Sequence, residues 1–336
     1  MRPTALRRAA FIAVAVLLVG ACATDDDVPA AAPSAAAEGA PRIAATLPPV
    51  VDLVQRVAGD RTQVTGILPA GADSHTYEPR PGDARVLSEA DLFITPSENL
   101  APAVVELWQS NIADGARGVA LNSEAIPERE WIYNESAVDI AEHGHGHDMN
   151  VHTWTNPPYA AAYVDVIERT LSERDPDGAA TYAANAEEIR AELEALDKAT
   201  AEAVETIPEE NRRLIVYHDS WDYFARHYGL EVVGSIQAAD LAEPSAAEVA
   251  AIVEQIRAAG VPVFFGSEVF PSDVLQAVAA ESGADYVGDL SDDRLPGEPG
   301  DPEHSYVGMM VANVRMIVES LGGNPSALDE VDPASA

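Results

Sequence analysis

Residues Leu214–Leu230 read LIVYHDSWDYFARHYGL, and this stretch changes from a strand pattern to a helix pattern at one histidine. The apolar run Leu214–Val216 predicts a short buried strand. From Trp221 onward the apolar residues recur at helical spacing, and Gly229 lies where a left-handed C-terminal cap is expected. His218 is therefore expected at the C-terminal end of a strand, where the sheet of an α/β protein presents side chains to its ligand.

Short apolar runs and helical patterns alternate on both sides of this stretch. Strands are expected at Arg42–Thr46, Gln63–Leu68, Asp91–Thr95, Gly118–Leu121, Arg213–Tyr217, Glu231–Ser235, Pro262–Gly266 and Asp285–Gly288. Alternation of this kind predicts parallel sheets, and it occurs in two separate halves of the chain. The longest helical pattern, residues 178–206, lies between the halves and would span about 40 Å. We therefore expect an α/β protein whose two lobes are joined by one long helix.

The balance of charge limits the class of ligand. The 336 residues include 56 acidic and 20 basic side chains, which gives a net charge of -36. Nucleic-acid binding requires a cationic surface, so we expect no nucleic-acid partner. An acidic surface attracts cations, but it also serves solubility alone, and the charge by itself names no ligand.

The first 21 residues have the pattern of a secretory signal. Arg2, Arg7 and Arg8 precede an apolar run, residues 9–19, that is too short to span a bilayer. The letters VGAC that end at Cys22 resemble a bacterial lipobox, whose cysteine is lipid-modified after cleavage. We expect a lipid anchor at Cys22, although an ordinary signal followed by a chance cysteine would read the same way. Because Cys22 is the only cysteine, disulfides and a cysteine-based zinc site are excluded.

Three histidines occur at the ends of predicted elements. His75 lies in a turn-rich loop after a strand, His152 lies just before a helix, and His218 follows a strand; Asp289 directly follows the last predicted strand. These residues are about 70 positions apart, unlike the local spacing of a zinc finger, so spacing alone does not support one metal site. Taken singly, each histidine is more readily explained as a hydrogen-bonded structural group than as a metal ligand.

Four motifs occur in order along the chain: LPAGADSHTYEP around His75, HTWTNP from His152, YHDSWDYFARHYGL around His218, and EPS from Glu243. Together they resemble the zinc and manganese solute-binding proteins of bacterial ABC importers, over roughly residues 42–321. The resemblance implies two Rossmann-like α/β lobes with parallel sheets, joined by one long rigid helix, with a metal ion in the crevice between them. It implies that His75 and His152 are ligands from the first lobe. His218 and Asp289 would be the ligands from the second lobe.

The second motif departs from the family in two respects. Val151 stands before His152, where the family usually has proline, and Thr155 and Asn156 precede Pro157, where the family commonly has Leu and Asp. Asp292 and Asp293 lie close to Asp289, so each of them remains a candidate for the fourth ligand.

The ligand set implied by the resemblance favours zinc. Three imidazoles and one carboxylate suit tetrahedral Zn²⁺, whereas Mn²⁺ favours more oxygen ligands. The manganese branch of the family usually has glutamate where this chain has His218. Imidazoles also bind copper and nickel tightly, so these metals are expected to bind in vitro.

Three other functions remain as alternatives to zinc uptake. The first is a manganese-binding importer component, and the second is an adhesin on the same fold. The third is a zinc hydrolase, but the chain contains neither His-Glu-x-x-His nor Gly-x-Ser-x-Gly. A sphere closed by four protein ligands would also leave no position for an activated water, so we expect a carrier and not an enzyme.

A second group of histidines alternates with glycine in residues 142–148. His143, His145 and His147 either contact zinc as an auxiliary loop or belong to a solvated loop with no metal role. His227 and His304 are expected to be structural or exposed to solvent.

The resemblance implies that the chain is a monomer whose partners are the importer's permease and ATPase. A zinc metallochaperone is a further possible partner. The protein would be held outside the cytoplasm on a membrane by its lipid anchor. The expected organisation is a signal peptide (1–21), a flexible tether (22–41), a first lobe (42–175), a connecting helix (176–208), a second lobe (209–323) and a frayed tail (324–336).

Overall fold

The first lobe is built on four parallel strands in the order β2-β1-β3-β4. A computed structural model describes residues 37, 39–133, 149–236, 246–267 and 272–334 of the chain. Its first-lobe strands are β1 (Ile43–Ala45), β2 (Val64–Gly66), β3 (Leu92–Thr95) and β4 (Arg117–Ala120). The expected parallel sheet is therefore present, and all four strands direct their C-terminal ends to the same edge.

Helices cover both faces of this sheet. They are α1 (Pro48–Ala58), α2 (Pro81–Glu89), α3 (Pro102–Asn111), α4 (Leu121–Ala125) and α6 (Pro157–Arg174). Ala44 and Phe93 share a buried cluster with residues of α2 and α3, whereas Ile43 and Ile94 share another with residues of α1 and α6. Neighbouring strand residues thus point to opposite faces, which is why these strands are apolar throughout.

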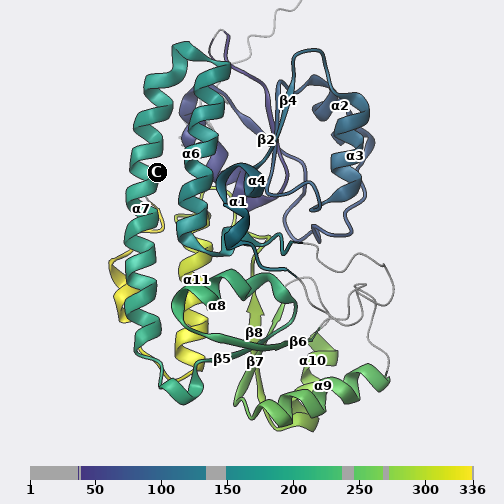
Figure 1. The fold of residues 1–336 in the computed structure, drawn as a ribbon, viewed down its shortest axis with the longest axis vertical. Helices are drawn as coiled ribbons and strands as arrows, with labels where there is room; N and C mark the ends of the chain where they lie inside the picture. The colour runs from purple at the N-terminus through teal and green to yellow at the C-terminus, as the bar shows by residue number, and fades with distance from the viewer. Residues whose placement is uncertain (1–36, 38, 134–148, 237–245, 268–271, 335–336) are drawn as a thin grey trace, which may run out of the picture. The chain divides into compact units, whose positions relative to one another are not determined.

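The long helix α7 (Ala179–Glu205) links the two lobes as expected. Its buried residues follow one face at helical spacing: Tyr182, Ala186, Ile189, Leu193, Leu196, Ala203 and Val204. Helix α7 packs against α1 and α6 of the first lobe and against α8 and α11 of the second. Figure 1 shows it running alongside both lobes. The connection is therefore a packed helix and not a flexible linker.

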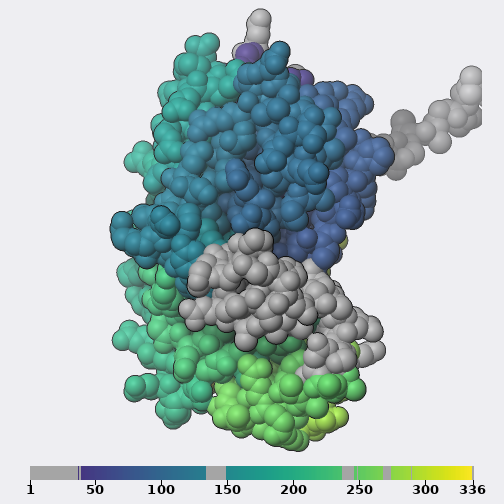
Figure 2. All heavy atoms as spheres, turned by 45° about the vertical axis from the view of Figure 1, so that its right-hand side comes forward, coloured from purple at the N-terminus to yellow at the C-terminus, as the bar shows by residue number. Residues whose placement is uncertain are grey.

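The second lobe repeats the α/β pattern but divides its strands into two pairs. The parallel pairs are β5-β6 and β7-β8, formed by β5 (Arg213–Val216), β6 (Glu231–Ser235), β7 (Val263–Ser267) and β8 (Asp285–Leu290). Each pair contains a register shift, although β5 and β7 also lie close together. Its helices are α8 (Asp222–Tyr228), α9 (Ala246–Ala259), α10 (Ser272–Ser282) and α11 (Tyr306–Ser320). Figure 2 shows the first lobe in blue above the second lobe in green.

Short 3-10 helices join these elements. They are η1 (Gly59–Arg61), η2 (Glu128–Glu130), η3 (Thr153–Thr155), η4 (Pro176–Gly178), η5 (Glu209–Asn211), η6 (Asp219–Trp221) and η7 (Pro325–Glu330). The last of them corrects the expectation of a frayed tail from Asn324. Asn324 accepts a hydrogen bond from the Ser326 backbone N–H, and Leu328 is buried where η7 packs on α7 and α11. The C-terminal segment is therefore part of the fold as far as Val331.

Several expected features lie outside the described residues. These are the signal segment, Cys22 and the histidine-rich loop 142–148. In the part of the chain that is described, no helix has both the length and the apolar character needed to cross a bilayer.

Candidate metal centre

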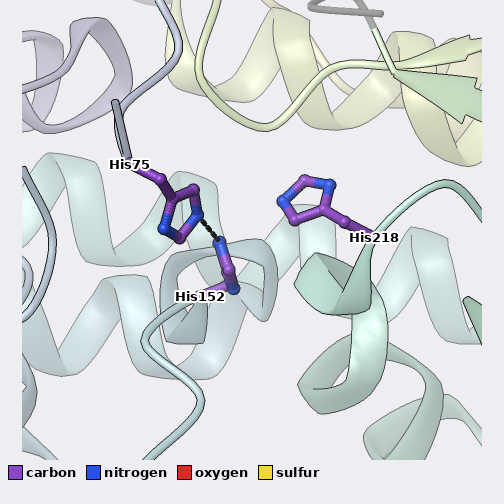
Figure 3. A group of neighbouring side chains, drawn as sticks. All are labelled: His75, His152 and His218. Carbon is purple, nitrogen blue, oxygen red and sulfur yellow. Dashed lines mark hydrogen bonds between the residues drawn. The ribbon is translucent and has the colours of Figure 1, made fainter. Parts of the chain in front are cut away.

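The three histidines expected as ligands come together from three separate elements. His75 lies in the loop between β2 and α2, His152 immediately precedes η3, and His218 lies between β5 and η6. One nitrogen from each ring lies within 4.8 Å of the others. Figure 3 shows the three imidazoles turned toward one another.

The distances within this group suit a single metal ion. The Nε2 atoms of His75 and His152 are 3.1 Å apart. The ring centroid of His218 lies 6.0 Å from that of His75 and 4.9 Å from that of His152. Two imidazole nitrogens that bind one tetrahedral Zn²⁺ at its usual bond length are about 3.3 Å apart. A small movement of His218 would therefore complete a three-nitrogen set.

Burial keeps two of the imidazoles neutral. His152 is 2 % exposed, and loss of water together with the neighbouring His218 and His75 lowers its pKa well below the usual value. Burial and the charge of His218 likewise lower the pKa of His75. A neutral imidazole has the free lone pair that a metal requires, so these two rings are ready to bind a cation at neutral pH.

His218 differs because a carboxylate faces it. Its Nε2 lies 3.3 Å from Oδ2 of Asp292, and both side chains are largely buried. Burial by itself would lower the pKa of His218, but the charge and hydrogen bond of Asp292 outweigh it and raise the pKa to about 9. Burial likewise opposes ionisation of Asp292, yet His218 lowers the pKa of that carboxyl to about 2. Without metal the two groups form a buried ion pair.

The candidate carboxylates lie at the end of β8 and in the segment that follows it. Asp289 lies in β8, where its backbone pairs with Gly266, and not after the strand as expected; its side chain is outside what the structure describes. Asp292 is the carboxylate beside His218. Oδ2 of Asp293 accepts a hydrogen bond from the backbone N–H of Ser74 at 3.3 Å. This segment therefore approaches the site from the second lobe and also contacts the loop that carries His75.

Two asparagines that the sequence patterns did not single out support His152. The amide of Asn122, in α4, donates to the carbonyl of Val151 at 2.9 Å, and its Oδ1 accepts from the hydroxyls of Thr153 and Tyr163. Asn150 accepts a hydrogen bond from the His152 ring at 2.9 Å. The only sequence signal for Asn150 is its place two residues before a candidate ligand, and Asn122 has no such signal.

The remaining described histidines lie apart from the group. His227 pairs through Nε2 with Oδ1 of Asp197 at 2.9 Å on the surface, and Nδ1 of His304 lies 2.9 Å from the carbonyl of Pro296. Both have local structural partners, as expected. His143, His145 and His147 lie outside the described residues.

Comparisons with known proteins agree with this architecture. The family described as "Zinc-uptake complex component A periplasmic" matches residues 43–320. A manganese-binding lipoprotein, MntA, of Halalkalibacterium halodurans is 29% identical over 270 residues, which cover 80% of this chain and 85% of that protein. A high-affinity zinc uptake system protein, ZnuA, of Paracoccus denitrificans is 32% identical over 242 residues, 66% of this chain and 74% of the relative.

A solved structure has the same fold. The periplasmic zinc binding protein TroA from Treponema pallidum superposes with a TM-score of 0.75 at 25% identity, covering 84% of this chain and 99% of that one. The likeness therefore extends over both lobes and the helix that links them.

Proposed function

We propose that this chain, which belongs to the family of periplasmic zinc-uptake component A, captures Zn²⁺ outside the cytoplasm and delivers it to an ABC importer. The chain is a metal-binding component of such an importer and not an enzyme. The identity of the metal as zinc and the residues that bind it are what we propose. The observation that carries it is the group of three ring nitrogens, from His75, His152 and His218, within 4.8 Å of one another.

Zinc is favoured over manganese by the chemistry of these ligands. Three imidazoles with one carboxylate suit tetrahedral Zn²⁺, while Mn²⁺ favours oxygen ligands and a higher coordination number. Manganese remains the second candidate because the MntA relative is named for it, whereas ZnuA and TroA are named for zinc.

The fourth ligand in this proposal is a carboxylate from residues 289–293. Asp289 is the residue that the resemblance to the family implies. Asp292 is the alternative, since its buried Oδ2 lies 3.3 Å from Nε2 of His218. Asp289→Ala and Asp292→Ala separate the two candidates, because only the variant that lacks the ligand loses the carboxylate oxygen from the coordination sphere in the zinc X-ray absorption spectrum.

The proposal extends to the parts of the chain outside the described residues. Cys22 is the proposed lipid anchor, which agrees with the name of the MntA relative as a lipoprotein. His143, His145 and His147 are proposed as an auxiliary zinc contact that is not needed for the main site. The proposed partners are the permease and ATPase of the importer, with a metallochaperone as a possible donor and with the chain acting as a monomer.

A competition titration against a chelator of known zinc affinity tests the proposal. We expect one tight Zn²⁺ per chain, and His152→Ala should weaken binding more than about 100-fold, because loss of an outer partner of a ligand already costs about 10–100-fold. His227→Ala is the matched control, since that histidine is paired with Asp197 on the surface. Deletion of residues 142–148 should leave the tight site. Unchanged affinity in His152→Ala, or tighter binding of Mn²⁺ than of Zn²⁺, would contradict the proposal.

A further inference from the structure

One buried amide, that of Asn150, connects the histidine segments of the two lobes. Asn150 is fully buried, and both ends of its side chain are used. Oδ1 accepts hydrogen bonds from the backbone N–H of His152 at 3.0 Å and from Nδ1 of the same residue at 2.9 Å. Nδ2 donates to the carbonyl of Asp219 at 2.7 Å and lies 3.2 Å from Oδ2 of Asp222.

These partners fix the orientation of the amide. A backbone N–H is only a donor, so the amide atom beside the His152 backbone is the oxygen; a backbone carbonyl is only an acceptor, so the atom beside Asp219 is the nitrogen. An amide flip would create two repulsive contacts. Because Oδ1 is only an acceptor, the ring nitrogen of His152 that faces it carries the proton.

This orientation determines which nitrogen of His152 is free. With the proton on Nδ1, the lone pair of the neutral ring is on Nε2. That atom is the one that lies 3.1 Å from Nε2 of His75, inside the group of ring nitrogens. The amide therefore selects the tautomer that directs a lone pair into the site.

The other end of the amide contacts the backbone next to another member of the group. Asp219 follows His218 directly, at the start of η6. Two other side chains bridge the same segments, since Trp154 donates to the carbonyl of Asp292 and Thr155 donates to that of Ser220. Neither of these makes a hydrogen bond to an imidazole nitrogen in the described part of the chain. Trp154 packs against the His152 ring, with ring centroids 5.2 Å apart, but among these three bridging residues only Asn150 forms a hydrogen bond with that ring.

We propose that Asn150 is a positioning residue, which selects the Nδ1–H tautomer of His152 and fixes that ring relative to the His218 segment. The inference rests on the proposed function only in taking the two histidines as metal ligands. The tautomer itself is a property of the metal-free protein.

The test uses the full chain with Zn²⁺ as the probe and two variants of Asn150. Asn150→Ala removes both ends of the amide. We expect His152 to lose its fixed Nδ1–H tautomer, seen in long-range ¹H–¹⁵N NMR spectra of the metal-free protein, and zinc affinity to fall by about 10–100-fold. Asn150→Asp keeps an acceptor for Nδ1 but cannot donate to Asp219. It should therefore retain the tautomer while still binding zinc more weakly than the native chain does.

Thr155→Val is the matched control, because it removes a buried hydroxyl that lies 2.9 Å from the backbone carbonyls of both His152 and Ser220 but does not contact an imidazole nitrogen. We expect it to keep the tautomer and to change zinc affinity less than about threefold, below the range for loss of a ligand's own partner. The inference is overturned if Asn150→Ala keeps the Nδ1–H tautomer and native affinity, or if Asn150→Asp loses the tautomer. If Asn150→Ala does not fold, Asn150→Asp still tests the inference through the tautomer of His152 and the zinc affinity. Failure of the proposed function would be seen separately, as unchanged zinc binding in His152→Ala.

Discussion

Zinc binding should release one proton from the His218–Asp292 pair at neutral pH. The pKa of His218 is raised to about 9 in the metal-free protein, so at pH 7.5 the ring is almost fully protonated. A metal requires the deprotonated ring, and each pH unit below the pKa costs about 1.4 kcal/mol. At pH 7.5 the cost is therefore about 2 kcal/mol, or about 30-fold in affinity. His75 and His152 add no proton at this pH, because their pKa values are lowered.

Replacement of Asp292 by asparagine tests this reasoning. Without this carboxylate, burial lowers the pKa of His218 while Asp219 and Asp293 still raise it, so the pKa should fall toward its usual value and the ring should be largely neutral at pH 7.5. The zinc affinity of the native chain should therefore rise with pH until about pH 9, whereas the zinc affinity of Asp292→Asn should become constant above about pH 7. This holds whether or not Asp292 also binds the metal, because proton release is measured separately from affinity.

The assay is calorimetric titration with zinc, under chelator competition, in buffers of different ionisation enthalpy at pH 7.5. The slope of the observed enthalpy against the buffer enthalpy gives the number of protons released. We expect about one for the native chain and about zero for Asp292→Asn. Asp197→Asn is the control, because it breaks the surface pair with His227 and should leave the count at one. A native count near zero, or equal counts in the native chain and Asp292→Asn, would refute the reasoning.

Three further substitutions test the packing of the fold, each by urea unfolding of the metal-free chain. Tyr306→Phe removes the buried hydroxyl that donates to the carbonyl of Trp154 at 2.6 Å, and it should lower the free energy of unfolding by about 1–3 kcal/mol; a loss below about 0.5 kcal/mol would mean that the contact is not made. Gly229→Ala places a methyl group in open space at a residue whose φ is 73°, so only backbone strain should act, and it should lower the free energy of unfolding by about 1 kcal/mol. An unchanged free energy of unfolding would mean that this cap is not in the left-handed region. Leu193→Ala, in the buried face of α7, should lower the free energy of unfolding by about 2–5 kcal/mol. Lys198→Ala, at an exposed position of the same helix, should change it by less than about 0.5 kcal/mol. Equal effects of the two substitutions would contradict the packing of α7.

Local patterns in the sequence were sufficient to predict a helix, strand or cap where the residues that form it are close along the chain. The change from an apolar run to helical spacing at His218 predicted β5 and α8, and the left-handed cap at Gly229 is confirmed. The helical spacing of apolar residues between positions 178 and 206 predicted α7 in the same way. These features depend on backbone preference and on one-sided burial, which both act over a few residues.

Contacts between distant segments could not be predicted in this way. The partners of Asn150 in the second lobe lie 69 and 72 residues away, so nothing near Asn150 indicates them. The pairing of Asp292 with His218 likewise depends on how the segment after β8 returns to the site. Leu328 and Val331 are too few apolar residues to establish a helical periodicity near the C-terminus, and the packing of η7 was missed for that reason.

X-ray absorption at the zinc edge, measured on the chain loaded with one equivalent of Zn²⁺, tests the central claim most directly. We expect three imidazole nitrogens and one carboxylate oxygen at about 2.0–2.2 Å, with one imidazole lost in His218→Ala. A sphere of mainly oxygen ligands, or a spectrum unchanged in His218→Ala, would contradict the proposed zinc site.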